Sequence, residues 1–97
     1  MTIESTTWLY VAIQKSGTSE QIVGQTDTEH DISYIPAFLN KETAQQSMYH
    51  LQLEKKQKYE VQAIIYEDLA RHALENSFLV FVLDEDGQVL ERLPAAS

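Results

Sequence analysis

Two segments of this chain carry bulky apolar side chains at both odd and even positions, and this pattern constrains the fold more than any other feature. In residues 6–14, Leu9, Val11 and Ile13 fall on one side and Trp8, Tyr10 and Ala12 on the other. In residues 32–39, the aliphatic set Ile35, Ala37 and Leu39 lies opposite Tyr34 and Phe38. A period of two in branched and aromatic residues predicts two β-strands, each with an aliphatic and an aromatic face.

A helix is expected directly after the second of these strands. Asn40 is a good N-cap residue because its side chain can accept a hydrogen bond from a free backbone amide of the first turn. The helix is predicted over residues 41–54, with a narrow buried stripe at Ala44, Met48 and Leu51.

A second helix is expected to begin near Glu67 and Asp68, because acidic residues in a first turn interact favourably with the helix dipole. Asn76 is expected to end this helix in a left-handed conformation. Its buried stripe is predicted to be Leu69, Ala70, Ala73 and Leu74.

The segment between the two helices fits two secondary structures. Residues 59–65 alternate as a strand would, with Tyr59, Val61, Ala63 and Ile65 on one side. Val61, Ile64 and Ile65 also fit a helical stripe. We favour the strand, because the alternative is a single helix over residues 41–76, which would be unusually long for a domain of this size.

Turn residues punctuate the rest of the chain. Ser16, Gly17 and Thr18 predict a reversal into a short strand over residues 20–23, followed by a polar, acidic loop over residues 26–31. The apolar run 78–83 predicts a strand buried on both sides, closed by a turn over residues 84–87 and a return strand over residues 88–90. Within the strand over residues 32–39, Pro36 lacks an amide donor, which predicts an edge strand or a bulge.

These elements predict an α+β fold in the order β-β-β-α-β-α-β-β. We expect a mixed or antiparallel sheet of five to six strands with two helices packed on one face. The 97 residues are expected to form one domain, residues 1–97, with a frayed tail at residues 94–97.

Composition narrows the classes of partner. The net charge of −8 argues against binding to a nucleic-acid backbone or to an anionic membrane surface, since both would repel the chain. The absence of cysteine excludes disulfides and thiolate metal sites. The N-terminal residues lack the basic and apolar regions of a signal peptide, so a cytoplasmic location is expected.

No motif predicts catalysis, a bound cofactor or a metal, and we expect a protein that is not an enzyme. Residues 84–87 place no carboxylate at the first or twelfth position of a calcium loop and are explained by a hairpin turn. Asp68 and His72 are spaced i, i+4, which predicts an exposed pair on a helix more readily than a general base. The local cluster Asp27, Glu29, His30 and Asp31 is expected to be a solvated acidic loop, with adventitious binding of a divalent cation as the alternative.

Two surfaces are candidates for contacts with a partner. If both helices cover the aliphatic face of the sheet, the other face exposes four rings, Trp8, Tyr10, Tyr34 and Phe38. The alternative is that the sheet curls and the long loops cover these rings. Lysines near the ends of the first helix form the one basic patch of an acidic chain, Lys41, Lys55, Lys56 and Lys58.

From Tyr34 onward the chain resembles the N-terminal domain of SseB-type bacterial proteins. The resemblance rests on residues 34–38, on Lys41, Glu42 and Ala44, and on residues 67–70 and 73–75 before an apolar strand. It covers about half of the chain, and small cyanobacterial domains of unknown function share the same element order. The last strand of the SseB-type domain tends to run into Asn-Pro, and residues 84–87 take that place here. The resemblance implies a fold and a bacterial cytoplasmic origin, and it carries no catalytic residue.

Two functions are therefore expected from the sequence. The first is a non-enzymatic protein-interaction or regulatory module that binds a protein partner, or a second copy of itself, through the aromatic face. The alternative is a small-molecule-binding domain with a pocket between the sheet and the loop over residues 24–31.

Overall fold

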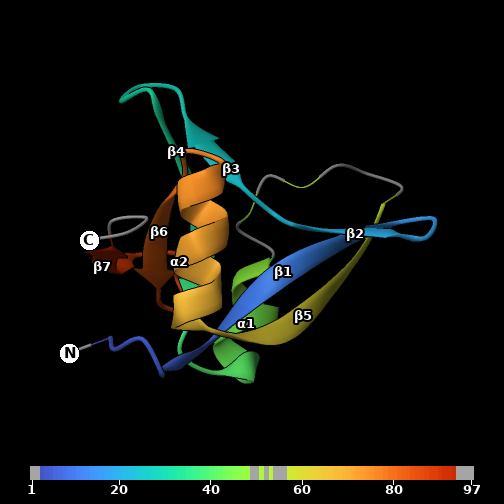
Figure 1. Ribbon diagram of the computed structural model, residues 1–97, viewed down its shortest axis with the longest axis horizontal. Helices are drawn as coiled ribbons and strands as arrows, with labels where there is room; N and C mark the ends of the chain where they lie inside the picture. The colour runs from blue at the N-terminus through green and yellow to red at the C-terminus, as the bar shows by residue number, and fades with distance from the viewer. Residues whose placement is uncertain (1–2, 49–50, 52, 54–56, 94–97) are drawn as a thin grey trace.

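The computed structural model describes residues 3–48, 51, 53 and 57–93 and shows the predicted α+β class. Seven strands join one open, mixed sheet, and two helices pack on it within the described residues (Figure 1). In chain order the elements are β1 (Trp8–Ser16), β2 (Ser19–Ile22), β3 (Gln25–Asp27), β4 (Ile32–Phe38), α1 (Lys41–Ser47), β5 (Lys58–Ile65), α2 (Tyr66–Glu75), β6 (Leu79–Leu83) and β7 (Val89–Leu93).

The sheet is built around β1 and β4, which pair antiparallel over only two residue pairs, Tyr10 with Phe38 and Val11 with Ala37. The outer edge of β1 pairs with β5 along its whole length. The outer edge of β4 pairs in parallel with β6, which pairs in turn with β7. The order β5-β1-β4-β6-β7 therefore runs across the sheet.

Beyond their two shared pairs, β1 and β4 diverge, and the chain from β2 to β3 enters the gap between them. β2 pairs with β1, and β3 pairs with the first half of β4. We call this gap the fork. The acidic loop predicted over residues 26–31 is therefore shorter than expected, because Thr26 and Asp27 belong to β3.

Pro36 stands where the fork opens, which corrects the prediction of an edge strand or a bulge around it. β4 is a central strand, and the register shift of this sheet lies between β6 and β7, at Val82 and Leu83. On the fork side of β4, Tyr34 pairs with β3 and Ala37 with β1, so Pro36 falls between the two partners. A regular ladder would place Ala12 opposite Pro36. The carbonyl oxygen of Ala12 instead accepts a hydrogen bond of 2.9 Å from the amide of Val23.

The two helices lie on opposite faces of the sheet, which corrects the prediction that both pack on one face (Figure 1). Leu69 and Ala73 of α2 pack on the aliphatic face with Leu9 and Val11. Ala44 of α1 packs on the other face with Phe38.

Strand order explains this arrangement. β4, β5 and β6 are mutually parallel, because β4 and β5 both run antiparallel to β1 and β6 runs parallel to β4. The connection through α1 crosses the sheet from β4 to β5, and the connection through α2 crosses back from β5 to β6. Two right-handed crossovers in opposite directions place their helices on opposite faces.

Several local predictions are confirmed. The side-chain oxygen of Asn40 accepts a hydrogen bond of 2.8 Å from the amide of Thr43, which is the expected N-cap. Residues 58–65 form β5, so the single long helix is excluded. Gly87 closes the predicted turn over residues 84–87 with a positive φ of 80°, and Val80 and Val82 of β6 are fully buried.

Other predicted helices and strands differ from the observed ones near their ends. α1 ends at Ser47, although the prediction extended it to residue 54, and the part of that prediction at residues 49–50, 52 and 54 lies outside the described residues. The left-handed residue after α2 is Ser77, with a φ of 61°, and not Asn76. Leu74 of the predicted buried stripe is 57% exposed. The last strand runs over residues 89–93, further than predicted, and the predicted frayed tail lies outside the described residues.

No helix among the described residues is long and apolar enough to cross a membrane.

We expect Pro36→Val to destabilise the protein by about 1–3 kcal/mol, because it introduces a buried amide whose natural acceptor, the carbonyl of Ala12, is already bonded to Val23. Urea unfolding measures this loss. Valine retains most of the apolar volume, so Pro36→Ala, which also removes packing, serves as the comparison and should lose more. A Pro36→Val variant as stable as the original chain would contradict this account of the fork.

Candidate functional site

The predicted aromatic surface does not exist as one exposed face, because α1 covers part of it. Phe38 is completely buried beside Ala44 of α1, and Tyr10 packs partly buried against the same cluster. Tyr34 stacks on Phe81 with ring centroids 4.5 Å apart, and burial raises the pKa of its hydroxyl. Trp8 alone of the four rings remains largely in solvent, 59% exposed.

The predicted basic patch is also dispersed. Lys41 and Lys58 are exposed, on α1 and β5, while Lys55 and Lys56 lie outside the described residues. In the register of β1 and β5, Lys58 lies opposite Lys15. The Nζ atom of Lys15 lies 2.9 Å from a carboxylate oxygen of Glu60, so acidic side chains share this part of the surface.

The acidic cluster is a self-contained turn. Asp27, Glu29 and His30 place their ligand-type atoms within 4.8 Å of one another. The Asp27 carboxylate accepts hydrogen bonds from the backbone amides of Glu29 and His30, and its second oxygen lies 2.9 Å from Nδ1 of His30. The bond from His30 is the main cause that lowers the pKa of Asp27. These bonds explain the cluster as the closure of the turn between β3 and β4.

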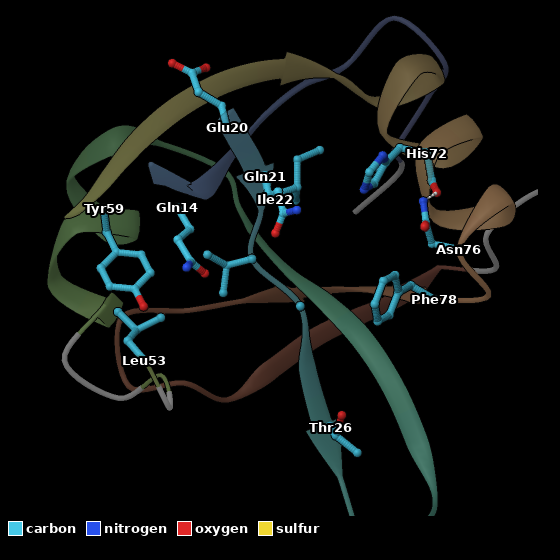
Figure 2. Close-up of a pocket in the computed structure, with 12 residues that line it drawn as sticks. Gln14, Glu20, Gln21, Ile22, Thr26, Leu53, Tyr59, His72, Asn76 and Phe78 are labelled. Atoms are coloured by element: carbon cyan, nitrogen blue, oxygen red, sulfur yellow. Dashed lines mark hydrogen bonds between the residues drawn. The ribbon is translucent and has the colours of Figure 1, made fainter. Parts of the chain in front are cut away.

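A groove of about 660 Å³ lies at the fork (Figure 2). The β2–β3 chain runs through it, with Gln14, Leu53 and Tyr59 on one side and the end of α2 with Phe78 on the other. The residues that line the groove are Gln14, Glu20, Gln21, Ile22, Val23, Gly24, Thr26, Leu53, Tyr59, His72, Asn76 and Phe78. Its volume is within the range of sites that bind small molecules.

Carboxamides form one wall of the groove. Gln14 of β1 and Gln21 of β2 are opposite each other in the register of the two strands, so their side chains share a face. Within the described part of the chain, neither of these two side-chain amides makes a hydrogen bond. Each therefore has donors and an acceptor that a ligand can use.

The opposite wall is formed by the end of α2 and the residue that follows it. Asn76 donates from its side chain to the carbonyl oxygen of His72 at 2.9 Å, which ties the two residues together at the rim. Asp68 lies 3.5 Å from Arg71, so the structure shows a different ion pair from the predicted Asp68–His72 pair, and His72 faces the groove (Figure 2).

Gly24 lets the ring of Phe78 lie against the β2–β3 chain. A Cβ atom at this position would lie 3.0 Å from the end of the ring, closer than ordinary contacts. Gly24 directly follows the short strand predicted over residues 20–23, and the structure adds this close approach of an aromatic ring.

The charge at the groove is negative. Among the described lining residues, Glu20 is the only one that carries a formal charge at neutral pH with histidine neutral. Lys15 is closer to Glu60, at 2.9 Å, than to Glu20, at 3.8 Å. Both contacts are ion pairs of Lys15, and the Glu20 side chain is 52% exposed, so its carboxylate can also meet a positively charged ligand group.

Comparison with known proteins adds no family: a scan of protein-family models, a search of curated proteins and a search of solved structures each gave no match. The resemblance to the SseB-type domain therefore stays a prediction.

Lys15 is expected to control the ionisation of Glu60, its partner in the ion pair of 2.9 Å. The hydrogen bond from Lys15 is the largest cause that lowers the pKa of Glu60, and the charge of Lys41 is the smallest. A lowered carboxyl pKa stabilises the fold above the unfolded-state pKa, and this contribution is lost as the pH falls through the folded-state pKa. Lys15→Met should therefore raise the pKa of Glu60 and reduce this acid-dependent loss.

NMR titration of the Glu60 carboxyl carbon measures this pKa directly. Lys41→Met is the matched control. It removes the same charge from a residue whose effect on the Glu60 pKa is weaker than that of Lys15, so it should raise the pKa of Glu60 less. Equal shifts in the two variants would contradict a direct bond from Lys15.

Proposed function

We propose that this protein is a non-enzymatic binding module whose ligand lies in the groove at the fork. The observation that carries the proposal is the pair of carboxamides Gln14 and Gln21, which make no side-chain hydrogen bond among the described residues, in a groove of about 660 Å³. Polar groups that converge on a concave surface orient a ligand and give it specificity.

The binding function is the one expected from the sequence, but the proposed binding surface is the groove and not the aromatic face. Of the aromatic residues first expected to meet a partner, Phe38 is buried and Tyr34 is stacked on Phe81. The alternative expected from the sequence was a pocket between the sheet and residues 24–31. That predicted pocket lies closer to the groove than the predicted aromatic surface does. Gly24 and Thr26 line the groove, but most of its other lining residues come from β1, β2, β5 and the end of α2 with the residues after it.

Trp8 supplies the competing site. Its ring is 59% exposed at the start of β1, and it is the one tryptophan in the sequence, so its indole amide gives a single identifiable NMR signal. Exposed aromatic rings are common at the centres of protein interfaces.

Backbone NMR spectra recorded with a library of small polar molecules and with mixed short peptides test the proposal. We expect at least one compound to shift the amide signals of residues 21–24 and 76–78 together, because these segments face each other across the groove. The indole signal of Trp8 should remain unchanged.

Gln21→Leu is the variant for this experiment, because it removes an exposed side-chain amide that makes no hydrogen bond to the residues that the structure describes. Gln45→Leu is the control, at an exposed position of α1 outside the groove lining. We expect about a five-fold loss of affinity in the first and none in the second, consistent with one hydrogen bond. Ligands that shift Trp8 and leave the groove signals unchanged would contradict the proposal.

A further inference from the structure

The groove contains a strand edge that no other strand covers within the described part of the chain. β2 has one partner, β1, and β3 has one partner, β4. The lining of the groove includes every residue from Glu20 to Gly24, which means that it follows the backbone of this segment. A ligand in such a site can form hydrogen bonds with backbone amide and carbonyl groups as well as with side chains.

The direction of the backbone groups follows from one hydrogen bond and the register. The amide of Val23 donates to the carbonyl of Ala12, so this cross-strand pair is hydrogen-bonded. Hydrogen-bonded and non-hydrogen-bonded pairs alternate in an antiparallel ladder. Gln21 therefore also bonds toward β1, whereas the amide and carbonyl groups of Glu20 and Ile22 point away from β1.

These outward groups recur every second residue, which is the repeat of a strand that can accept another strand. Peptides that add to a sheet edge gain affinity from main-chain hydrogen bonds and specificity from alternate side chains. Two kinds of side chain around the edge can contact the side chains of such a peptide. Gln14 and Gln21 offer amides, and Ile22 and Phe78 offer apolar contact.

Resting on the proposed function, we propose that the ligand of the groove is an extended, basic peptide segment that pairs with the outer edge of β2. Charge selects the basic class, because Glu20 is the charged group of the lining and the whole chain carries −8. The carboxylate of Glu20 meets a lysine or arginine of the peptide, while Glu60 retains Lys15.

Hydrogen exchange with a defined probe tests the inference. The probe is a capped heptapeptide of alternating valine and lysine flanked by threonine. Its binding should slow exchange of the Glu20 and Ile22 amides about ten-fold or more, because they gain partners. The Gln21 and Val23 amides already bond to β1, so their exchange should change little and they serve as internal controls.

Two matched comparisons separate strand pairing from charge attraction. The same peptide methylated on every backbone nitrogen keeps its side chains and charges but cannot donate main-chain hydrogen bonds, so its affinity should fall about ten-fold or more. Glu20→Gln should weaken the unmethylated peptide about two- to five-fold, whereas Glu85→Gln, which makes the same charge change at an exposed turn, should leave its affinity unchanged.

Three other outcomes would contradict the inference, and they differ in what they mean for the proposed function. If the methylated peptide binds equally well in the groove and the exchange of Glu20 and Ile22 is unchanged, strand pairing is wrong and the proposed function stands. If no peptide or small molecule shifts the groove signals, both proposals are wrong. If Glu20 and Ile22 are protected without peptide in a species whose mass by light scattering doubles with concentration, the edge pairs with a second copy and the peptide inference is overturned.

Discussion

The missing amide of Pro36 is the constraint on which the arrangement of this sheet depends. A regular ladder between β1 and β4 would continue from Tyr10 and Phe38 to Ala12 and Pro36, but proline cannot donate to the Ala12 carbonyl. Val23 donates to that carbonyl instead. The chain of β2 and β3 thereby enters between the two central strands, and the fork with its groove results.

The order of the strands also decides which face of the sheet each helix covers. Because β1 separates β4 from β5, the connection through α1 crosses to one side of the sheet and the connection through α2 returns across it. The helices then cover opposite faces, and each face acquires its own buried cluster. On the face that carries α1, the stack of Tyr34 on Phe81 is extended by the guanidinium of Arg92, 5.5 Å from the centre of the Phe81 ring. Of the four rings predicted to form a surface, Phe38 is therefore a core residue, and Tyr10 and Tyr34 pack partly buried against the same cluster.

The parity of apolar residues predicted the two faces of the strands correctly, because that pattern is local. Leu9, Val11 and Ile13 share one buried cluster, and Phe38 lies in the other. The N-cap at Asn40 and the turn at Gly87 were predictable for the same reason. Which helix covers which face depends on the order of strands, and strand order is set by pairings between residues far apart in sequence, which parity does not contain.

The pocket predicted beside residues 24–31 shares only Gly24 and Thr26 with the groove. The rest of the groove could not be predicted on similar grounds, since most of its walls come from β1, β2, β5 and the end of α2. One local signal was present. Along the face of β1 that begins with Trp8, Tyr10 and Ala12, the next residue is Gln14, and its neighbour across the hairpin is Gln21. Two adjacent carboxamides that continue an apolar face mark the place where the core ends and a polar recess begins.

The edge of β2 also shows why an open strand of this kind need not cause self-association. Natural edge strands are protected by short length and by charge. β2 has four residues and carries Glu20, and a second copy would bring another Glu20 and a further net charge of −8 against the same edge. The repulsion that disfavours a second copy becomes attraction for a basic segment, so the same carboxylate protects the edge and selects its partner. The length of β2 then limits pairing to the two outward residues Glu20 and Ile22, which favours a reversible complex over a permanent one.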